Sequence, residues 1–242
     1  MQRLLGEIRR FDSMFSLIQK GEKVAIGLSG GKDSLALLHL LNGYREIKAF
    51  ELVAFHVSPN DNFPTNELQT MCDALSVPFH SRKSHLFERL FSGEYKNPCA
   101  MCARERRGIL VQTAKEEGCT SLALGHHLDD ALETFLMSLL KEGRCFTLKP
   151  YSFMERGGIR LIRPLLSIPE QSLIAFVNRK NLKPVKNPCP IDKKTTREEM
   201  KQLLLTLQNL YPDIRQKLTS ALYKENFFVK EGSHAGENRN SD

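Results

Sequence analysis

Short apolar runs alternate with longer amphipathic segments over the first two thirds of the chain. The short runs are typical of buried β-strands, and segments with apolar residues every three or four positions are typical of α-helices. We predict strands over residues 23–28, 51–57, 77–80, 121–125 and 158–164. The helices expected around them include residues 1–19, 35–41, 65–75, 103–117 and 127–141. Strands that alternate with helices predict a parallel sheet covered on both faces.

The pattern becomes helical after residue 165, with helices expected over residues 169–180, 195–209 and 211–225. The tail has little apolar content, and we expect it to be disordered. The fold class is therefore α/β, a doubly wound parallel sheet with a helical C-terminal extension. The predicted organisation is an N-terminal helix, an α/β domain, a helical extension and a disordered tail, over residues 1–22, 23–166, 167–228 and 229–242.

The chain has 35 Lys and Arg residues and 28 Asp and Glu residues, which give a formal net charge of +7. A basic protein suits a polyanionic partner. No segment approaches the ~18 consecutive apolar residues of a membrane span. The N-terminus carries Glu7 and no apolar run, so no signal peptide is indicated. We expect a cytoplasmic protein without a membrane partner, whose cysteines serve metal binding or catalysis rather than disulfides.

The sequence Ser29-Gly30-Gly31-Lys32-Asp33-Ser34 joins the first predicted strand to a helix. Glycines let the backbone approach an anion closely, and the helix N-terminus adds partial positive charge. The spacing does not fit a Walker loop, which has four residues between its first glycine and Gly-Lys-Ser/Thr. It resembles instead the SGGKDS signature of the PP-loop ATP pyrophosphatases, which split ATP into AMP and pyrophosphate. We assign all six residues to the nucleotide site.

A second strand-to-helix junction, residues 125–134, carries Asp129, Asp130 and Glu133. Acidic residues here are explained by helix capping alone, or they hold Mg²⁺ on ATP phosphates. Ligands of doubly wound sheets bind beyond the carboxyl ends of the strands, where this junction and the first loop both open. That convergence favours the functional reading, in which His126 and His127 contact the nucleotide or neutralise charge.

Within this site we assign two catalytic residues and two further nucleotide-binding residues. Asp33 and Asp130 are the predicted catalytic residues, while His56 and Gly125 are predicted to line the nucleotide site. The predicted cofactors are ATP and Mg²⁺.

Three of the six cysteines have a setting that suggests a metal. Cys99 and Cys102 form a C-x-x-C before a predicted helix, and Cys189 lies in a Pro-bounded turn. Structural zinc takes four ligands, which would require Asp192 as the fourth, whereas three thiolates suit an iron–sulfur cluster with one open iron. A redox pair at Cys99 and Cys102 would leave Cys189 unexplained. The remaining cysteines, interpreted as core residues, are Cys72, Cys119 and Cys145.

These motifs, in this order, resemble those of the tRNA 2-thiocytidine synthetase family. The matching stretches are Cys99 to Leu110, Leu124 to Asp130 and Ile162 to Leu165. The resemblance implies that ATP adenylates the C2 oxygen of a tRNA cytidine in the anticodon loop and that sulfur replaces this oxygen. It also implies a [4Fe–4S] cluster on Cys99, Cys102 and Cys189, a sulfur donor (cysteine desulfurase or sulfide) and a homodimer. Several members carry a cysteine where this chain has Asp192.

A basic cluster follows the cysteines at two places in the sequence. The first, after Cys102, consists of Arg104, Arg106 and Arg107, and the second, after Cys189, consists of Lys193, Lys194 and Arg197. They are either tRNA phosphate contacts or a solvated basic surface. Two other functions compete with thiolation. A ligase of the tRNA-isoleucine lysidine synthetase type would have no use for three placed cysteines. A non-catalytic RNA-binding module with ATP and a structural zinc ion would release no AMP.

Overall fold

The computed structural model describes residues 1–58, 60, 63–84, 98–154, 157–185, 196–224 and 227–228, with the side chain of Cys99 excepted. The chain divides into two compact units. The first comprises Met1–Asp129 and Tyr151–Asp192, and the second comprises Asp130–Pro150 and Lys193–Asp242.

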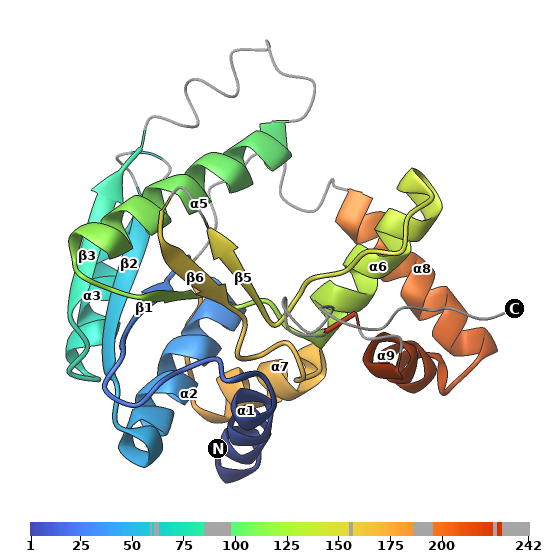
Figure 1. Ribbon diagram of the computed structural model, residues 1–242, viewed down its shortest axis with the longest axis horizontal. Helices are drawn as coiled ribbons and strands as arrows, with labels where there is room; N and C mark the ends of the chain where they lie inside the picture. Colours follow the sequence, from blue (N-terminus) through green and yellow to red (C-terminus); the bar gives the residue numbers. More distant parts are fainter. Residues whose placement is uncertain are drawn as a thin grey trace, which may run out of the picture. The chain divides into compact units, whose positions relative to one another are not determined.

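The first unit is built on a six-stranded sheet with the strand order β3-β2-β1-β4-β6-β5 (Figure 1). The strands are β1 (Lys23–Gly27), β2 (Glu51–Ser58), β3 (Phe79–Lys83), β4 (Ser121–Ala123), β5 (Tyr151–Met154) and β6 (Ile159–Ile162). β1 lies centrally, where Val24 is in register with Leu52 on one side and with Ser121 on the other. All neighbouring strands are parallel except β5 and β6, which form an antiparallel hairpin that the hydrophobic pattern did not predict.

Helices cover both faces of this sheet, as the predicted fold class requires (Figure 1). On one side lie α1 (Gln2–Phe15), α2 (Lys32–Lys48) and α7 (Glu170–Arg179), and on the other lies α5 (Pro98–Glu116). The core beneath α5 consists of buried apolar side chains from the helix and four strands, among them Val53, Phe55, Val111, Leu122 and Leu161. A further helix, α3 (Thr65–Asp73), follows β2. The predicted doubly wound fold is confirmed.

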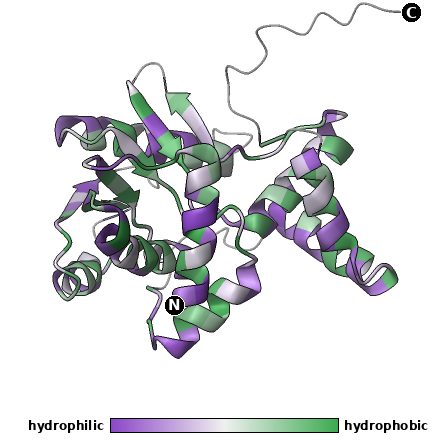
Figure 2. Cartoon of the chain, turned by 60° about the horizontal axis from the view of Figure 1, so that its bottom comes forward, coloured by the Kyte–Doolittle hydropathy of each residue, from purple (hydrophilic) through white to green (hydrophobic). Residues whose placement is uncertain are grey.

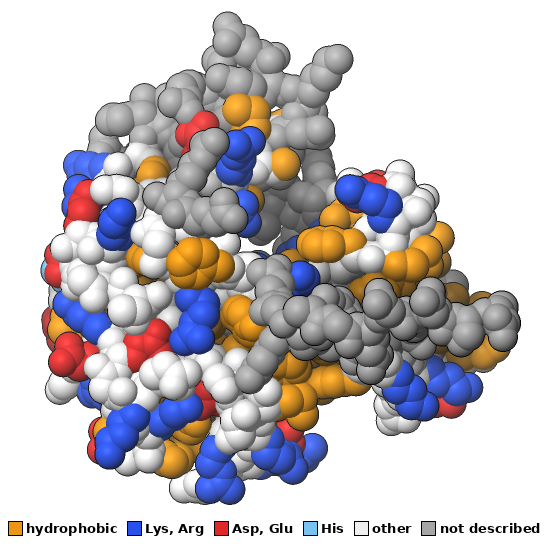
Figure 3. Space-filling model, viewed as in Figure 1, with side chains coloured by type: hydrophobic (Ala, Val, Ile, Leu, Met, Phe, Trp, Pro, Cys, Tyr) orange, Lys and Arg blue, Asp and Glu red, His pale blue; other side chains and the backbone are white. Residues whose placement is uncertain are grey.

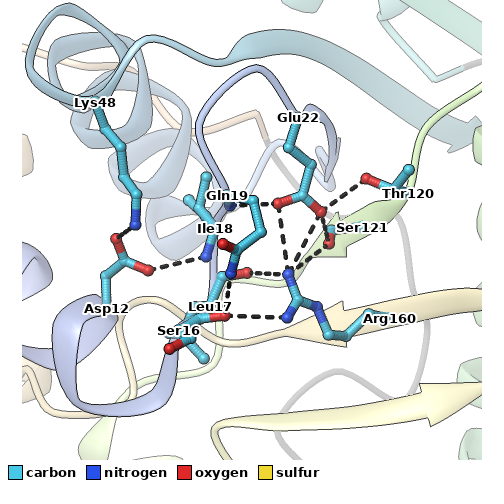
Figure 4. A network of polar contacts seen from close by, with 10 residues as sticks. All are labelled: Asp12, Ser16, Leu17, Ile18, Gln19, Glu22, Lys48, Thr120, Ser121 and Arg160. Atoms are coloured by element: carbon cyan, nitrogen blue, oxygen red, sulfur yellow. Dashed lines mark hydrogen bonds and ion pairs between the residues drawn. The ribbon is translucent and has the colours of Figure 1, made fainter.

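A polar network ties α1 to the amino end of the sheet (Figure 4). Arg160 of β6 donates to the carbonyls of Ser16 and Leu17 at 3.0 and 2.8 Å. Buried Asp12 accepts hydrogen bonds from the Ile18 amide at 2.9 Å, the Tyr44 hydroxyl at 2.6 Å and Lys48. Because buried polar groups are costly unless they are paired, this network holds α1 in place. The network lies at the amino end of the sheet, so it does not occupy the opposite, carboxyl end.

Two details of the fold bear on the cysteines. α5 begins at Pro98, five residues before the predicted start, so that Cys99 and Cys102 belong to its first turns. Proline favours the first position of a helix because its missing N–H is not needed there. Cys72 and Cys119 are buried as predicted, but the prediction for Cys145 is wrong. Cys145 is exposed and lies in an irregular segment that follows the end of α6.

The second unit is helical and contains most of α6 (Leu128–Glu142), together with α8 (Thr196–Leu210) and α9 (Ile214–Lys224). The rings of Phe135 and Phe227 pack with their centroids 5.6 Å apart, and the Thr147 hydroxyl donates to the Ala131 carbonyl at 2.6 Å. The helices carry both hydrophobic and hydrophilic surfaces, as Figure 2 shows. Among the described residues, no helix combines the length and the hydrophobicity needed to cross a bilayer.

Candidate functional site

The turn between β1 and α2 depends on Gly30, whose φ of +84° is unfavourable for residues with a side chain. A Cβ atom on Gly30 would also lie 3.1 Å from the Cβ of Val185 and 3.3 Å from the Phe63 ring. The Val185 amide donates to the Gly30 carbonyl at 2.9 Å. The segment that follows α7 therefore packs directly on the loop of residues 29–34, the phosphate loop.

Hydroxyl groups brace the phosphate loop from within. Ser29 donates to the hydroxyl of Ser34 at 3.0 Å, and Ser34 donates to the Gly31 carbonyl at 2.9 Å. Gly31 is the N-cap of α2, and no side chain caps this helix end within the described part of the chain. An uncapped helix N-terminus behind a braced glycine loop presents backbone N–H groups and partial positive charge to an anion.

Gly125 brings the β4–α6 loop against the phosphate loop. A Cβ atom on Gly125 would lie 3.1 Å from the carbonyl carbon of Asp33 and from the amide nitrogen of Ser34. Both contacts are with backbone at the start of α2, which cannot move aside as a flexible side chain would. The two loops that the sequence predicted to converge are therefore in van der Waals contact, and only glycine permits this approach.

Gly125→Ala is accordingly expected to push the two loops apart by a few tenths of an ångström. ATP binding should weaken by about tenfold, because the displaced loop would lose about one hydrogen bond to the charged phosphates. Isothermal titration of ATP measures the change. Gly6→Ala is the matched control, since nothing lies within 4 Å of a Cβ atom at Gly6 in α1. ATP affinity of Gly125→Ala equal to that of Gly6→Ala would contradict the close-approach argument.

Lys32 and Asp33 form an ion pair at the start of α2, with Lys32 Nζ 2.9 and 2.8 Å from the two carboxylate oxygens. Glu170, the first residue of α7, holds the same ammonium group at 2.8 Å. Burial by itself lowers the pKa of Lys32, but the hydrogen bonds and charges of Asp33 and Glu170 outweigh it and leave the pKa raised. Lys32 is therefore a permanent cation held between two carboxylates.

His127 and Asp129 complete this group of charges. The buried His127 ring lies 3.8 Å from Asp33 through Nε2 and 4.0 Å from Asp129 through Nδ1. The Asp129 carboxylate accepts the backbone N–H of Glu170 at 2.7 Å and so caps α7. The loops after β1, β4 and β6 meet in this cluster.

Glu170 was not among the residues predicted for the site. Its sequence signal was ambiguous, because a Pro-Glu pair at the start of a helix is fully explained by capping and the helix dipole. The available clue was topological. Glu170 follows the loop after the parallel strand β6, and the other two loops of the cluster likewise follow parallel strands.

Asp130 belongs to the second unit, where Arg197 donates to its carboxylate at 3.0 Å. The same guanidinium lies 3.9 Å from Glu133 and 3.4 Å from the Thr134 hydroxyl. Arg197, for which the sequence left a phosphate contact and a solvated basic surface open, forms ion pairs with acidic residues. Within the described residues no group of three His, Cys, Asp or Glu side chains is arranged to hold a metal ion.

His56 lies beneath the phosphate loop rather than beside it. Its Nδ1 lies 2.7 Å from the carbonyl of Leu28, and its ring stacks on Phe63 with centroids 4.4 Å apart. Burial, together with the nearby charge of Arg106, lowers the pKa of His56 to about 4. The hydrogen bond to the Leu28 carbonyl raises this pKa, but by less than burial lowers it. The imidazole is neutral at pH 7 and donates from Nδ1 to Leu28, so His56 supports the loop. Its predicted contact with the nucleotide stays a prediction.

Basic residues of α5 approach the same end of the sheet. Arg106 is near enough to His56 to lower its pKa. Arg107 is likewise near enough to Arg163 to lower the pKa of that guanidinium. Burial, with the nearby charge of Arg107, lowers the pKa of Arg163 to about 10. Cys102 is half-buried one turn before Arg106. The side chain of Cys99 and all of residues 186–195, including Cys189, lie outside the described residues, so the predicted cysteine site stays a prediction.

A doubly wound sheet with a glycine loop, an uncapped helix and a second loop fitted against it defines a nucleotide-binding α/β protein. In agreement, the sequence profile of the PP-loop domain matches residues 5–207. The tRNA-cytidine(32) 2-sulfurtransferase of Bordetella pertussis is 34% identical over 227 residues, which cover 91% of this chain and 71% of that protein. The enzyme of the same name from Syntrophotalea carbinolica is 35% identical over 217 residues, covering 86% and 83%.

Among solved structures, the U34-tRNA thiolase NcsA of Methanococcus maripaludis, determined with its [4Fe–4S] cluster, superposes with a TM-score of 0.74. It is 26% identical, and the match covers 94% of this chain and 79% of NcsA. The chain therefore belongs to the PP-loop family, in the group of the tRNA-cytidine(32) 2-sulfurtransferases.

Proposed function

We propose that this protein is an ATP-dependent tRNA sulfurtransferase that converts a cytidine of the anticodon loop to 2-thiocytidine. The observation that carries the proposal is the phosphate loop, closed by Gly125, in a chain whose relatives are tRNA-cytidine(32) 2-sulfurtransferases. The cytidine O2 attacks the α-phosphorus of ATP and pyrophosphate leaves. Sulfur then attacks C2, the C–O bond breaks, and AMP leaves with the original oxygen.

The chain's own residues supply binding and charge stabilisation for the first step. The N–H groups at the start of α2 and the Lys32 ammonium bind phosphate oxygens. Asp33 orients Lys32 and would help to hold Mg²⁺ on the phosphates. The residues present fit Mg·ATP, because a glycine cradle lies beside carboxylates that supply hard oxygen ligands. Asp130 is proposed as the second catalytic carboxylate, with Arg197 holding its side chain in the second unit.

The cysteine set fits an iron–sulfur cluster. Cys99 and Cys102 are three residues apart in the first turns of α5, and residues at this spacing share one face of a helix. A helix N-terminus favours thiolates, the form that binds metal. We propose that Cys99, Cys102 and Cys189 hold a [4Fe–4S] cluster. When bound, it supplies an iron without a protein thiolate where sulfide from a cysteine desulfurase or from solution can bind.

The cysteines separate thiolation from its two rivals. A ligase of the lysidine synthetase type needs no soft-metal ligands, and a zinc-binding RNA module would not need the phosphate loop to cleave ATP. Thiolation uses both features in one reaction. A cytidine in a single-stranded loop can be splayed into a pocket without opening a duplex, which suits the anticodon loop. Such a reaction belongs in the cytoplasm.

The first basic cluster is proposed as the tRNA contact, because Arg104 on α5 is exposed and Arg107 is half-buried beside it. Replacing both by alanine is expected to weaken tRNA binding and to lower the slope of log affinity against log salt by about 1.5 to 2, one counterion per lost phosphate contact. Filter binding over a salt series measures this slope. Arg9→Ala with Arg10→Ala, two exposed arginines on α1, removes the same charge and should leave the slope unchanged.

Apolar side chains exposed on the second unit support a homodimer. They gather over α6 and α8 (Figure 3), and those at least 41% exposed are Leu139, Leu140, Phe146, Leu205, Leu210 and Tyr211. Soluble proteins rarely leave contiguous apolar surface open to water unless it binds something. Light scattering of the protein, with Leu210→Glu expected to give monomers, tests whether this surface joins two copies.

Nucleoside mass spectrometry of tRNA from a deletion strain tests the proposed function. Loss of 2-thiocytidine, restored by the intact gene and not by an Asp33→Ala variant, is the expected outcome. Loss of 2-thiouridine instead would reassign the target base, and loss of lysidine would place the chain among the ligases. An unchanged nucleoside profile would refute tRNA modification altogether.

A further inference from the structure

The peptide bond between Gly30 and Gly31 lies at the centre of the phosphate loop, and its plane has two possible orientations. Glycines tolerate backbone angles on either side of zero, so no side chain prevents this peptide from turning over. In one orientation the Gly31 N–H faces a bound phosphate, to which it can donate. In the other the Gly30 carbonyl, with its partial negative charge, faces the same anion. Phosphate binding therefore depends on the orientation that the rest of the chain selects.

A backbone donor from outside the loop holds this peptide. The Val185 amide donates to the Gly30 carbonyl at 2.9 Å, the usual length of an N–H···O bond. Val185 is buried and belongs to the first unit, as the phosphate loop does. It lies so close to Gly30 that a Cβ atom on the glycine would be 3.1 Å from the Val185 Cβ. The bond is therefore shielded from water that would compete for the carbonyl.

The same bond sets the direction of the next N–H group. A trans peptide is planar, so its C=O and N–H groups point in opposite directions. Because the Gly30 carbonyl is turned toward Val185, the Gly31 N–H points to the other side, where it donates to the Ser29 hydroxyl at 3.3 Å in an exposed contact. This distance is just beyond the usual range for N–H···O bonds, so little is lost when a phosphate oxygen replaces the hydroxyl.

We propose that Val185 is a positioning residue for ATP, and that its backbone N–H selects the orientation of the Gly30–Gly31 peptide that binds phosphate. When this donor is removed, the peptide distributes between both orientations, and the fraction in the wrong one is lost to binding. The coupling is reciprocal, so a bound phosphate stabilises the bond between Val185 and Gly30. This inference rests on the proposed function and adds to it a residue that lies outside the signature of the loop.

Hydrogen exchange at the Val185 amide of the full-length protein tests the reciprocal effect. Labelling with ¹⁵N-valine limits the amide signals to valines, and Val185→Ala identifies the signal of Val185 by its loss. The ligand is α,β-methylene-ATP with Mg²⁺, which cannot be cleaved at the bond the enzyme breaks. Val77 is the internal control, because it is a buried valine whose amide also donates to a backbone carbonyl after a helix, that of Cys72 at 3.0 Å. We expect the analogue to slow exchange at Val185 at least about fivefold more than at Val77. A bond that only packs the segment onto the loop would give equal slowing.

Isothermal titration of the same analogue tests the donor directly. Val185→Pro removes the N–H and should raise the Kd about tenfold, the loss of one hydrogen bond to a charged phosphate. Val185→Ala keeps the N–H and should raise the Kd less than threefold. Val77→Pro removes the comparable donor before β3 and should leave the Kd within twofold of the wild type.

The exchange measurement uses the wild-type protein, so it decides the question even where Val185→Pro does not fold. Equal slowing at Val185 and Val77, or a Kd of folded Val185→Pro within twofold of that of Val77→Pro, overturns the inference while leaving ATP binding intact. Failure of the wild type to bind the analogue would overturn the proposed function, and this inference with it.

Discussion

Replacing Asp33 by alanine is expected to reduce tRNA-dependent AMP release by at least about a hundredfold, the effect of losing a group that stabilises charge in the transition state. Asp33 contacts Lys32 through both carboxylate oxygens and lies 3.8 Å from His127, while its backbone is in contact with Gly125. The variant therefore removes one of the two carboxylates that hold Lys32, together with the carboxylate proposed to help hold Mg²⁺. Chromatography of the nucleotides formed from α-labelled ATP, with unmodified tRNA present, measures the loss.

The fold should survive this change. Asp33 lies in the first turn of α2, where a carboxylate contributes about 0.3–1 kcal/mol through the helix dipole. The midpoint temperature of thermal unfolding should fall by only a few degrees. Asp73→Ala, at an exposed aspartate of α3 that accepts a hydrogen bond from Gln69, is the matched control and should release AMP at the wild-type rate. Turnover by Asp33→Ala within threefold of this control would remove Asp33 from the catalytic residues.

The sheet and the phosphate loop could be predicted because their signals are local. A buried parallel strand reads as a short apolar run, and a loop at a helix N-terminus needs glycines at fixed places. The convergence of the two loops followed from topology, since parallel strands bring their carboxyl ends to one edge. Gly30 has the positive φ that the phosphate loop needs. The close approach of Gly125 to the backbone of Asp33 confirms that the two loops converge.

What escaped prediction depends on partners distant in the sequence. Strand β5 is an edge strand whose Phe153 is 57% exposed, so it has no buried run to reveal it. The pairing of Glu170 with Lys32 joins residues 138 positions apart, and nothing in either neighbourhood specifies it. Arg197 and Asp130 pair in the same way, and the neighbourhood of neither residue specifies this contact. Charged pairs of this kind require the packed structure.

Serine at Cys99, Cys102 or Cys189 is expected to abolish both the brown colour of anaerobically purified protein and thiolation of tRNA. A hydroxyl is a hard ligand and replaces a thiolate poorly in a cluster, so losing one of three protein ligands should release most of the iron. Iron and acid-labile sulfide counted per chain after anaerobic reconstitution measure the loss. Four irons per wild-type chain, falling to less than one in each variant, is the expected result.

Cys145→Ser is the matched control, because Cys145 is an exposed cysteine of the described residues and was assigned no ligand role. It should keep four irons and full thiolation. Asp192→Ala should also keep the cluster, since iron in such clusters prefers thiolate to carboxylate and added sulfide displaces an oxygen ligand. The Asp33→Ala variant provides the converse separation, with an intact cluster and no AMP release. Stoichiometric zinc without sulfide, or a cluster that survives Cys189→Ser, would show that the assignment of a [4Fe–4S] cluster to these three cysteines is wrong.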